Sequence, residues 1–484
     1  MAHATSTRSA AHAPPAHAAH GAHAPHGAEA PARSWALLAL LAVAEFMVVL
    51  DVTVVNVALP TIADALGLGA GRLSWVVTAY VLFTGGLMLL GGRLADLTDR
   101  RTVFLAGLGL FTASSLASGL AWSGDALILA RALQGAGAAL LLPAALSIVT
   151  TAYTGRQRAV ALGVWSALGS AGAAAGVLLG GVLVTLLDWR WIFFVNVPIG
   201  IALAVLTPRL LAAAPARRLR GGRLDLLGAG TLMAGLVSLV LAVEGTADHG
   251  WTSTRTLGLA ALAALLLGAF AAVERSGSRP LVPPATWRRR SLVSGAGMMF
   301  AATGVLVGAF FLGSLYLQRT LGATALETGL AFLPLALVIL AGAHLTQHVL
   351  PKLGTRPPMA AGMALAGGGA LLLSRAPGDA SYAADLLPGF VALGLGVGTA
   401  LVAVAVVTMD SIAHDEAGLA SGLLSTAHEL GAAIGVAALA AVAVAGGIGD
   451  AFAVSAAVAG VGALAALVAV PAVRPEPGAR MAVH

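Results

Sequence analysis

Long apolar runs constrain the fold of this chain more than any other feature of its sequence. A helix of about 20 apolar residues is long enough to cross the hydrocarbon core of a bilayer. Runs of this kind lie at residues 35–58, 73–92, 102–121, 125–150, 159–187, 191–211, 226–246, 256–273, 292–317, 328–350, 358–374, 383–408, 418–444 and 451–472. The sequence therefore predicts an all-α integral membrane protein with about 14 transmembrane helices.

Composition excludes several other classes of protein. Only 10% of the residues are charged and 58% are hydrophobic, whereas a soluble domain carries about 25% charged residues. The chain has no cysteine, which excludes disulfides, thiolate catalysis and cysteine metal sites. The net charge of +6 does not indicate nucleic-acid binding, because the basic residues lie in short loops between apolar runs. No nucleophile–base pair, metal-ligand set or Walker A sequence stands out, so neither an enzyme nor an ATP-driven pump is predicted, and no cofactor is expected.

The basic residues predict the orientation. If the N-terminus is cytoplasmic, 21 Arg and Lys residues lie on the cytoplasmic side and five on the outside, while Arg131 lies within a span. The excess of positive charge inside predicts a multi-pass protein of the inner or plasma membrane with both termini in the cytoplasm. An odd number of spans would destroy this bias.

An internal repeat predicts the domain organisation. Glycines at an offset of 259 residues relate the fourth span to the twelfth and the fifth to the thirteenth, as in the pairs Gly135 with Gly394 and Gly176 with Gly435. Duplicated halves are common in secondary transporters. We expect a six-helix bundle at 35–211, two inserted helices at 225–275, and a second six-helix bundle at 291–472.

The tails are expected to be cytoplasmic extensions. Residues 1–33 are rich in Ala, His and Pro and lack an apolar run, which predicts disorder and no cleavable signal peptide. Four histidines spaced by three residues, from His17 to His26, would suit a metal ion, but a compositionally biased extension is the simpler interpretation and no metal site is predicted. Residues 473–484 form the second tail.

A series of motifs identifies a family. In chain order they are LDVTVVNVALP (50–60), GGRLADLTDRR (91–101), ARALQGAGAA (130–139), WRWIFFVNVPIG (189–200), DLLGAG (225–230), HGW (249–251) and YLQRTLGATALETGLAFLP (316–334). This ordered series resembles the fourteen-helix drug:proton antiporter branch of the major facilitator superfamily, over about residues 35–472. The resemblance implies multidrug efflux and antibiotic resistance by proton-coupled transport.

Asp51 and Arg131 are the first candidates for proton coupling. Asp51 lies about eight residues, roughly 12 Å, from the predicted outer end of the first span, and Arg131 lies at a similar depth in the fourth. A carboxylate at membrane depth is costly and is a functional hypothesis by default. The resemblance implies that Arg131, in the pattern RxxQG, serves proton transfer. Alternatively, each residue is structural and is satisfied by a neighbouring helix.

Glu45 and Glu429 are further candidates for binding protons or a cationic substrate. Glu45 lies near the middle of the first span, and Glu429 follows His428 near the middle of the thirteenth. In the family that the motifs resemble, Gln is more usual at position 45 and Arg-Gln at positions 428–429. This chain therefore departs from the family pattern at both places. His344 and His348, one turn apart, would suit a metal or a proton relay, but core histidines are the simpler interpretation.

Two motifs concern the moving parts. The resemblance implies that the loop with Gly92, Asp96, Arg100 and Arg101 is a cytoplasmic gate, in which glycine makes a tight turn and charges latch one conformation. Leu97 and Asp99 depart from its pattern. Gly172, Gly176 and Gly180 form a GxxxGxxxG ridge that allows close helix approach. Val177 replaces the proline of the family motif, so a weaker kink is expected.

The sequence thus predicts a secondary transporter that exports hydrophobic drugs or metabolites, expected to be cationic, in exchange for protons by alternating access. Its partners would be a small-molecule substrate, protons and the lipid bilayer, and no nucleic acid. A dedicated exporter of one metabolite or self-made antibiotic would carry the same motifs. A non-transporting membrane sensor is the alternative from another class, and it predicts no flux.

Overall fold

The structure is a computed structural model of the chain. It describes residues 1, 32–153, 155–211, 225–276, 282, 284–410 and 417–473. Nearly all of the two predicted tails, 1–33 and 473–484, therefore lies outside the described residues.

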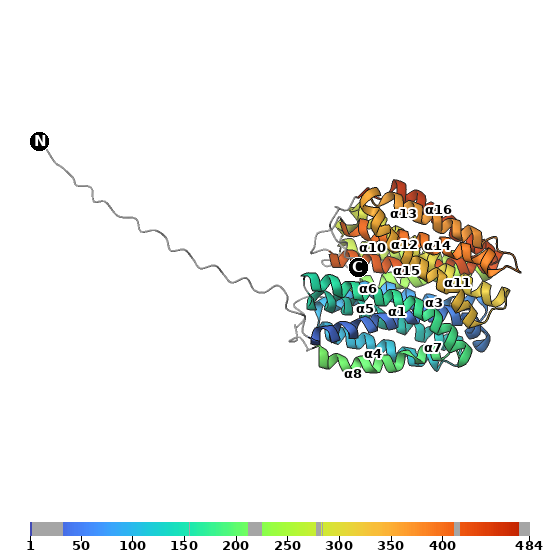
Figure 1. The fold of residues 1–484 in the computed structure, drawn as a ribbon, viewed down its shortest axis with the longest axis horizontal. Coiled ribbons are helices and arrows are strands. Elements are labelled where there is room, and N and C mark those ends of the chain that lie inside the picture. The colour runs from blue at the N-terminus through green and yellow to red at the C-terminus, as the bar shows by residue number, and fades with distance from the viewer. Residues whose placement is uncertain are drawn as a thin grey trace.

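The described chain is built from helices that run roughly along one common axis (Figure 1). No strand occurs in these ranges. The helices are α1 (Ala32–Leu66), α2 (Ala70–Leu73), α3 (Trp75–Leu97), α4 (Arg100–Gly119), α5 (Gly124–Ala152), α6 (Gly155–Leu186), α7 (Trp191–Phe194), α8 (Asn196–Leu210), α9 (Leu226–His249), α10 (Thr254–Ser276), η1 (Pro284–Arg288), α11 (Arg290–Leu315), η2 (Tyr316–Thr320), α12 (Ala325–Leu353), α13 (Arg356–Leu373), η3 (Tyr382–Leu386), α14 (Leu387–Asp410), α15 (Ala417–Gly446) and α16 (Ile448–Val468).

The predicted fold class is confirmed. Each of the 14 apolar runs corresponds to one long helix or, for the sixth run, to α7 followed by α8. Thirteen segments of the described chain are long and apolar enough to cross a membrane. The fourteenth helix, α13, is less apolar because it begins with Arg356 and two prolines and contains three consecutive glycines, but it packs against α14 and α16.

One predicted boundary is wrong in a way that matters for the site. The first run was expected to end at residue 58, but α1 continues through Pro60 to Leu66. Ile62 and Ala63 in this extension are buried in the hydrophobic core, so packing holds the helix together beyond the proline. Asp51 therefore lies 15 residues from the end of α1 instead of eight.

The long helices form two groups with matching contacts. In the N-terminal group α1 packs on α6 and α4 on α5; in the C-terminal group α11 packs on α15 and α13 on α14. A methyl group at Gly176 would lie 2.8 Å from the carbonyl oxygen of Leu50, and one at Gly435 would lie 2.9 Å from that of Gly304. Glycines paired by the sequence repeat thus allow equivalent helix approaches in the two groups.

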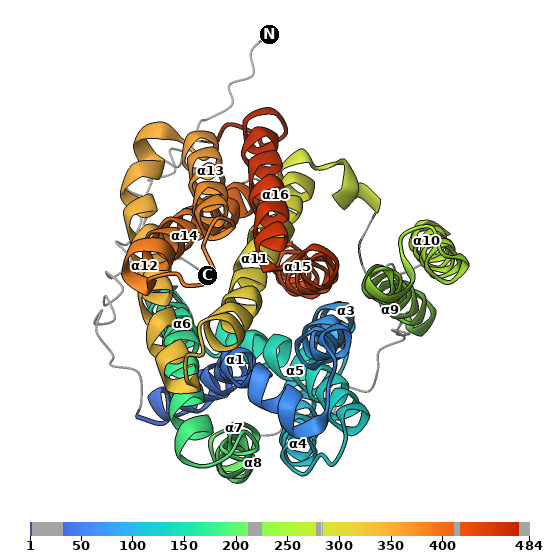
Figure 2. The same ribbon diagram turned by 90° about the vertical axis from the view of Figure 1, so that its right-hand side faces the viewer.

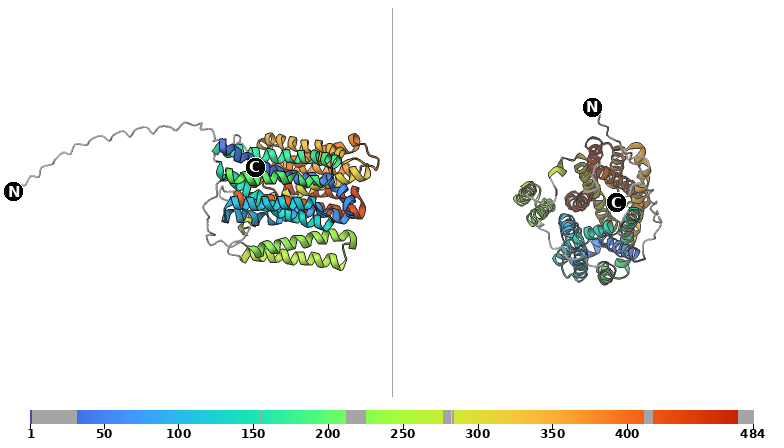
Figure 3. Two further views of the ribbon diagram at one scale, coloured as in Figure 1. Left: turned by 90° about the horizontal axis from the view of Figure 1, so that it is seen from below. Right: turned by 90° about the vertical axis from the view of Figure 1, so that its left-hand side faces the viewer.

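The helices α9 and α10 lie at the side of these groups. Viewed along the bundle in Figure 2, they form a peripheral pair, and Figure 3 shows the same pair along one flank. They pack on each other, and α9 also packs on α3 from the N-terminal group and on α15 from the C-terminal group. This pair thus covers the seam between the two groups.

The bundle has two ends, which we name by the chain. The terminal end is where α1 begins and α16 ends, and the distal end is where α1 ends and α3 begins. At the distal end, Gln318 Nε2 donates to the carbonyl oxygen of Val57 at 2.8 Å and joins the two groups. The backbones of α6 and α12 also meet there, beside Gly181 and Gly329. These contacts close the distal end.

Candidate functional site

The candidate site begins with a buried ion pair between α1 and α5. Arg131 donates a hydrogen bond from its guanidinium to Oδ2 of Asp51. The side chain of Asp51 is 0% exposed and that of Arg131 is 1% exposed. Because a buried charge without a partner is very costly, removal of either residue would leave the other uncompensated.

Neutral side chains from two further positions complete the coordination of Asp51. Gln134 Nε2 and Asn196 Nδ2 both donate to Oδ1 of Asp51, each at 2.8 Å. Asn196 also donates to Ser115 Oγ at 3.1 Å, and Ser115 donates to the carbonyl oxygen of Phe193 at 3.0 Å. Helices α1, α5 and α8 therefore meet at one carboxylate, and α4 is linked to it through Asn196.

Arg131 is held at the centre of this network. Its Nε donates to the carbonyl oxygen of Val76 at 3.1 Å, and one terminal nitrogen also donates to Gln134 Oε1 at 2.8 Å. The guanidinium carbon lies 4.2 Å from the ring centroid of Tyr80 and 5.6 Å from that of Phe193. Such contacts with aromatic faces favour the cation. A change in the charge of Asp51 would therefore alter contacts of α1, α3, α5 and α8 at the same time.

A second group of ionisable residues lies between α1 and α15. His428 Nδ1 lies 3.5 Å from Glu429 Oε1, and Glu45 interacts electrostatically with both of these residues. Glu45 is half-buried beside Gly169 of α6, and the Cβ atom of Glu429 packs against Gly85 of α3. The structure thus brings together two acids that lie 384 positions apart in the chain.

The two groups differ in their access to solvent. Asp51 is sealed, whereas the side chain of Glu429 is 16% exposed and that of His428 is 43% exposed. Tyr80 lies between the two groups, since it interacts electrostatically with Asp51, Arg131 and Glu429. Its hydroxyl is buried and has no hydrogen-bond partner among the described residues.

The loop between α3 and α4 differs from its expected geometry. Gly92 lies inside α3, so the prediction of a tight turn at this glycine is wrong. The chain turns at Thr98 instead. Asp96 is exposed and forms no ion pair within the described residues. Arg100 donates to Thr151 Oγ1 at 3.1 Å, at the end of α5. Arg101 is half-buried in the first turn of α4.

Asp99, which departs from the family pattern in this loop, has a local structural role. It is the N-cap of α4, and its carboxylate accepts from the backbone N–H of Thr102 at 3.2 Å. A carboxylate at this position satisfies a free N–H group and interacts favourably with the helix dipole.

The glycine ridge of α6 lies against α1. Methyl groups at Gly172 and Gly180 would lie 2.9 Å and 3.0 Å from carbonyl oxygens of α1, and Gly176 between them meets the same helix. The α6 helix continues without a break through Val177. The ridge therefore sets the distance between α6 and the helix that carries Asp51 and Glu45.

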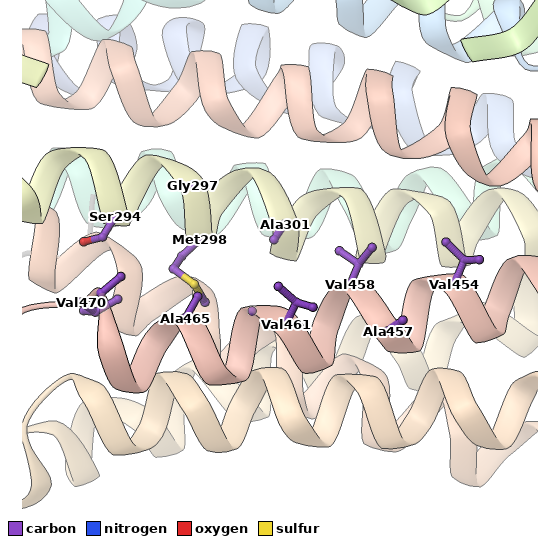
Figure 4. Close-up of a pocket in the computed structure, with 12 residues that line it drawn as sticks. Ser294, Gly297, Met298, Ala301, Val454, Ala457, Val458, Val461, Ala465 and Val470 are labelled. Atoms are coloured by element: carbon purple, nitrogen blue, oxygen red, sulfur yellow. The ribbon is translucent and has the colours of Figure 1, made fainter. Parts of the chain in front are cut away.

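Two other features lie away from the acidic residues. His344 and His348 have ring centroids 4.8 Å apart, but both are exposed, so the interpretation as core histidines is wrong. Within the described residues no group of three potential ligands could hold a metal ion. A pocket of about 490 Å³ lies between α11 and α16 (Figure 4), lined by apolar side chains such as Met298 and Val461, with Ser294 at one end.

Sequence reasoning did not single out several members of the network. Gln134 and Asn196 lie within quoted motifs, and a polar side chain inside an apolar run was the signal that would have found them. Ser115 and Tyr80 carried no comparable signal, because their roles depend on which helices become neighbours. Glu244 on α9 was also missed, although an acid within a span is a functional hypothesis by default.

Comparison with protein families agrees with the resemblance seen in the motifs. The family described as "Major Facilitator Superfamily" matches residues 41–436 and 310–481. The puromycin resistance protein pur8 of Streptomyces alboniger is 40% identical over 415 residues, which cover 84% of this chain and 81% of that protein. The lincomycin resistance protein of Streptomyces lincolnensis is 36% identical over 450 residues, 91% of this chain and 92% of that protein.

Further relatives extend the comparison to multidrug transport and to solved structures. The multidrug resistance protein Stp of Mycobacterium tuberculosis is 34% identical over 398 residues, 82% of this chain and 73% of that protein. The crystal structure of a peptide transporter, POT, in complex with sulfate has a TM-score of 0.66 at 18% identity and covers 89% of this chain and 93% of its own. At that identity the likeness shows the fold alone.

Proposed function

Because the chain belongs to the Major Facilitator Superfamily, we propose that it is a secondary transporter that exports hydrophobic, cationic drugs or metabolites in exchange for protons. The named relatives support export, since they include resistance proteins for puromycin and lincomycin and a multidrug resistance protein. As in the sequence analysis, the six-plus-two-plus-six arrangement at 35–211, 225–275 and 291–472 would let two bundles rock about a central cavity.

The proposed coupling of transport to proton movement rests on the buried ion pair of Asp51 and Arg131. An acid sealed among helices can exchange a proton only when the helices move, and its neutralisation would leave Arg131 without its charge partner. Protonation of Asp51 and rearrangement of α1 against α5 are therefore parts of one step. This is the property that a proton-driven conformational cycle needs.

Glu45 and Glu429 are proposed to receive the cationic part of the substrate. They lie on opposite helix groups and are less sealed than Asp51. Two neighbouring carboxylates repel each other when both are charged, so a substrate cation or a proton between them relieves the repulsion. Competition of this kind would release protons as substrate binds.

The orientation proposed from the basic residues puts the terminal end in the cytoplasm and the distal end outside the plasma membrane. The closed distal end then represents a conformation that receives substrate from the cytoplasm. The loop with Gly92, Asp96, Arg100 and Arg101 would lie on the cytoplasmic side and act in gating. Asp96 is available there for an ion pair in another conformation.

A dedicated exporter of one antibiotic is the second candidate function. It is favoured by the names of two relatives from Streptomyces, a puromycin and a lincomycin resistance protein, each of which matches more than 80% of the chain. The two functions share fold and coupling and differ only in the breadth of substrates. A non-transporting sensor, by contrast, would give no flux at all.

Purified protein in proteoliposomes tests the proposal. A pH gradient is imposed and the movement of ethidium, puromycin and lincomycin is followed, with Asp51→Asn as the variant and Asp64→Asn as the matched control. Asp64 lies on the same helix and is exposed. We expect gradient-driven movement that a protonophore abolishes, that Asp51→Asn loses and that Asp64→Asn keeps.

Each other result has a definite meaning. Movement of puromycin or lincomycin alone would favour the dedicated exporter. Gradient-driven transport that persists in Asp51→Asn would contradict the role of Asp51 in proton coupling. Glu45 and Glu429 would then be the candidates for that role. Absence of movement for all probes in the wild-type protein would contradict export and favour the sensor.

A further inference from the structure

Glu244 is a buried acid outside the network described above. It lies on α9, five residues before the helix ends at His249, roughly 7 Å from the distal end of that helix. The residue is 7% exposed. The hydroxyl of Ser74, which directly precedes α3, donates to Oε1 of Glu244 at 2.7 Å.

The second carboxyl oxygen of Glu244 has no partner. Oε2 is buried and accepts no hydrogen bond in the described structure. Ser74 Oγ also lies 3.3 Å from the carbonyl oxygen of Gly71, to which it can donate. A protonated Glu244 can thus donate to Ser74, which in turn donates to Gly71. A charged Glu244 has only one neutral donor, which is poor compensation for a buried carboxylate.

No positive charge compensates Glu244 in the described part of the chain. On α2, Arg72 pairs with Asp125, and at the start of α10 Arg255 contacts His249 at 3.2 Å. The remaining charged residues of α3 lie at its terminal end, and those described on α15 are the mid-helix pair His428 and Glu429. Glu244 itself forms no ion pair there. The geometry therefore favours a bound proton over a bound cation side chain.

The position of Glu244 gives its proton a structural effect. The α9 helix packs on both α3 and α15, which belong to different helix groups (Figure 2). Among described residues, the bond between Ser74 and Glu244 is the one hydrogen bond that joins α9 to the N-terminal group. Loss of the proton would place an unpaired charge in this contact and loosen α9 from α3.

We propose that Glu244 is a second proton-binding site, separate from Asp51, whose proton fastens the inserted helices to the distal end of α3. Glu244 lies nearer the distal than the terminal end of α9, so its proton would exchange with the solution on the distal side of the membrane. Acid on the distal side holds the distal-closed arrangement together. This proton site belongs to the inserted helices, and its occupancy does not depend on which compound is exported.

Infrared spectroscopy and spin labelling of the full-length protein in lipid nanodiscs test the proposal. The chain has no cysteine, so paired labels at Ala65 on α1 and Leu257 on α10, both exposed, report the distance between the inserted helices and the N-terminal group. The variants are Glu244→Gln, which mimics the protonated acid, and Ser74→Ala, which removes its partner. Asp64→Asn is the control, because it neutralises an exposed acid at the same end.

We expect a carbonyl band of a protonated carboxyl group at acid pH that disappears as pH rises and is absent from Glu244→Gln. The label distances should broaden over the same pH range in the wild type and in Asp64→Asn, whereas Glu244→Gln should keep the narrow acid distribution throughout. Ser74→Ala should broaden at lower pH than the wild type. The proposal would be overturned if the carbonyl band and label distances of Glu244→Gln changed with pH as in the wild type. It would also be overturned if the wild-type label distances did not change with pH.

Discussion

At the scale of single residues, Arg131 decides how the candidate site works, because one guanidinium contacts an acid, an amide, a carbonyl oxygen and an aromatic ring. Sealed polar networks of this kind are costly when half of a pair is removed and nearly neutral when both halves are replaced. This asymmetry separates the structural contribution of the pair from its contribution to transport.

The first prediction compares single and double substitutions of the ion pair. Arg131→Gln should lower the stability of the purified protein by about 3–5 kcal/mol, because Asp51 is left buried without its cation. The double variant Asp51→Asn with Arg131→Gln should recover most of this loss but should not transport. Thermal unfolding in detergent and flux in proteoliposomes measure the two effects. Equal stabilities of the single and double variants would show that the pair is not coupled.

The second prediction concerns Tyr80, whose ring lies against Arg131 and whose hydroxyl has no hydrogen-bond partner in the described part of the chain. Tyr80→Phe should leave stability within about 1 kcal/mol of the wild type, because it removes a buried group that makes no hydrogen bond. Tyr80→Leu should cost about 2 kcal/mol more, because it removes the aromatic face from a desolvated cation. Thermal unfolding of the two variants distinguishes these outcomes, and a larger loss for Tyr80→Phe would mean that its hydroxyl has a partner in another conformation.

At the scale of helices, the glycine ridge of α6 determines how closely the acid-bearing helix α1 is held. Gly176→Val should destabilise the protein by about 1–3 kcal/mol, because the added side chain overlaps the backbone at Leu50. Gly163→Ala is the matched control on the same helix, since no atom lies within 4 Å of its added methyl group. Thermal unfolding should leave the control unchanged or slightly stabilised; similar losses for both variants would contradict the packing role.

The same scale shows what the sequence could and could not reveal. Span length and hydropathy are properties of single helices, so all 14 apolar runs were predictable. The extension of α1 beyond Pro60 was not, because tertiary packing around Ile62 and Ala63 stabilises it. The meeting of Glu45 with Glu429 depends on which helices become neighbours, and neither a periodicity nor a motif encodes that. Gln134 and Asn196 were visible as polar residues in apolar runs, but their shared partner was not.

At the scale of the whole molecule, the orientation that the basic residues predict has to be consistent with the end at which the bundle is closed. An exporter must receive substrate from the cytoplasm, and the structure is closed at its distal end, where the two helix groups meet at Gln318 and Val57. The 21-to-5 distribution of Arg and Lys predicts that the opposite end lies in the cytoplasm. The predicted orientation and the observed packing at the distal end are therefore both consistent with export.

The last prediction tests this orientation directly. Single cysteines can be introduced without removing any native ones, because the chain has none. Trp122→Cys lies at the distal end in an exposed loop, and Trp287→Cys lies in the exposed segment before α11 at the terminal end. In intact cells a membrane-impermeant maleimide should label position 122 and spare position 287, which should react only after permeabilisation. The reverse pattern would place the termini outside, and the distal-closed conformation would then face the exterior and receive substrate from the wrong side for export.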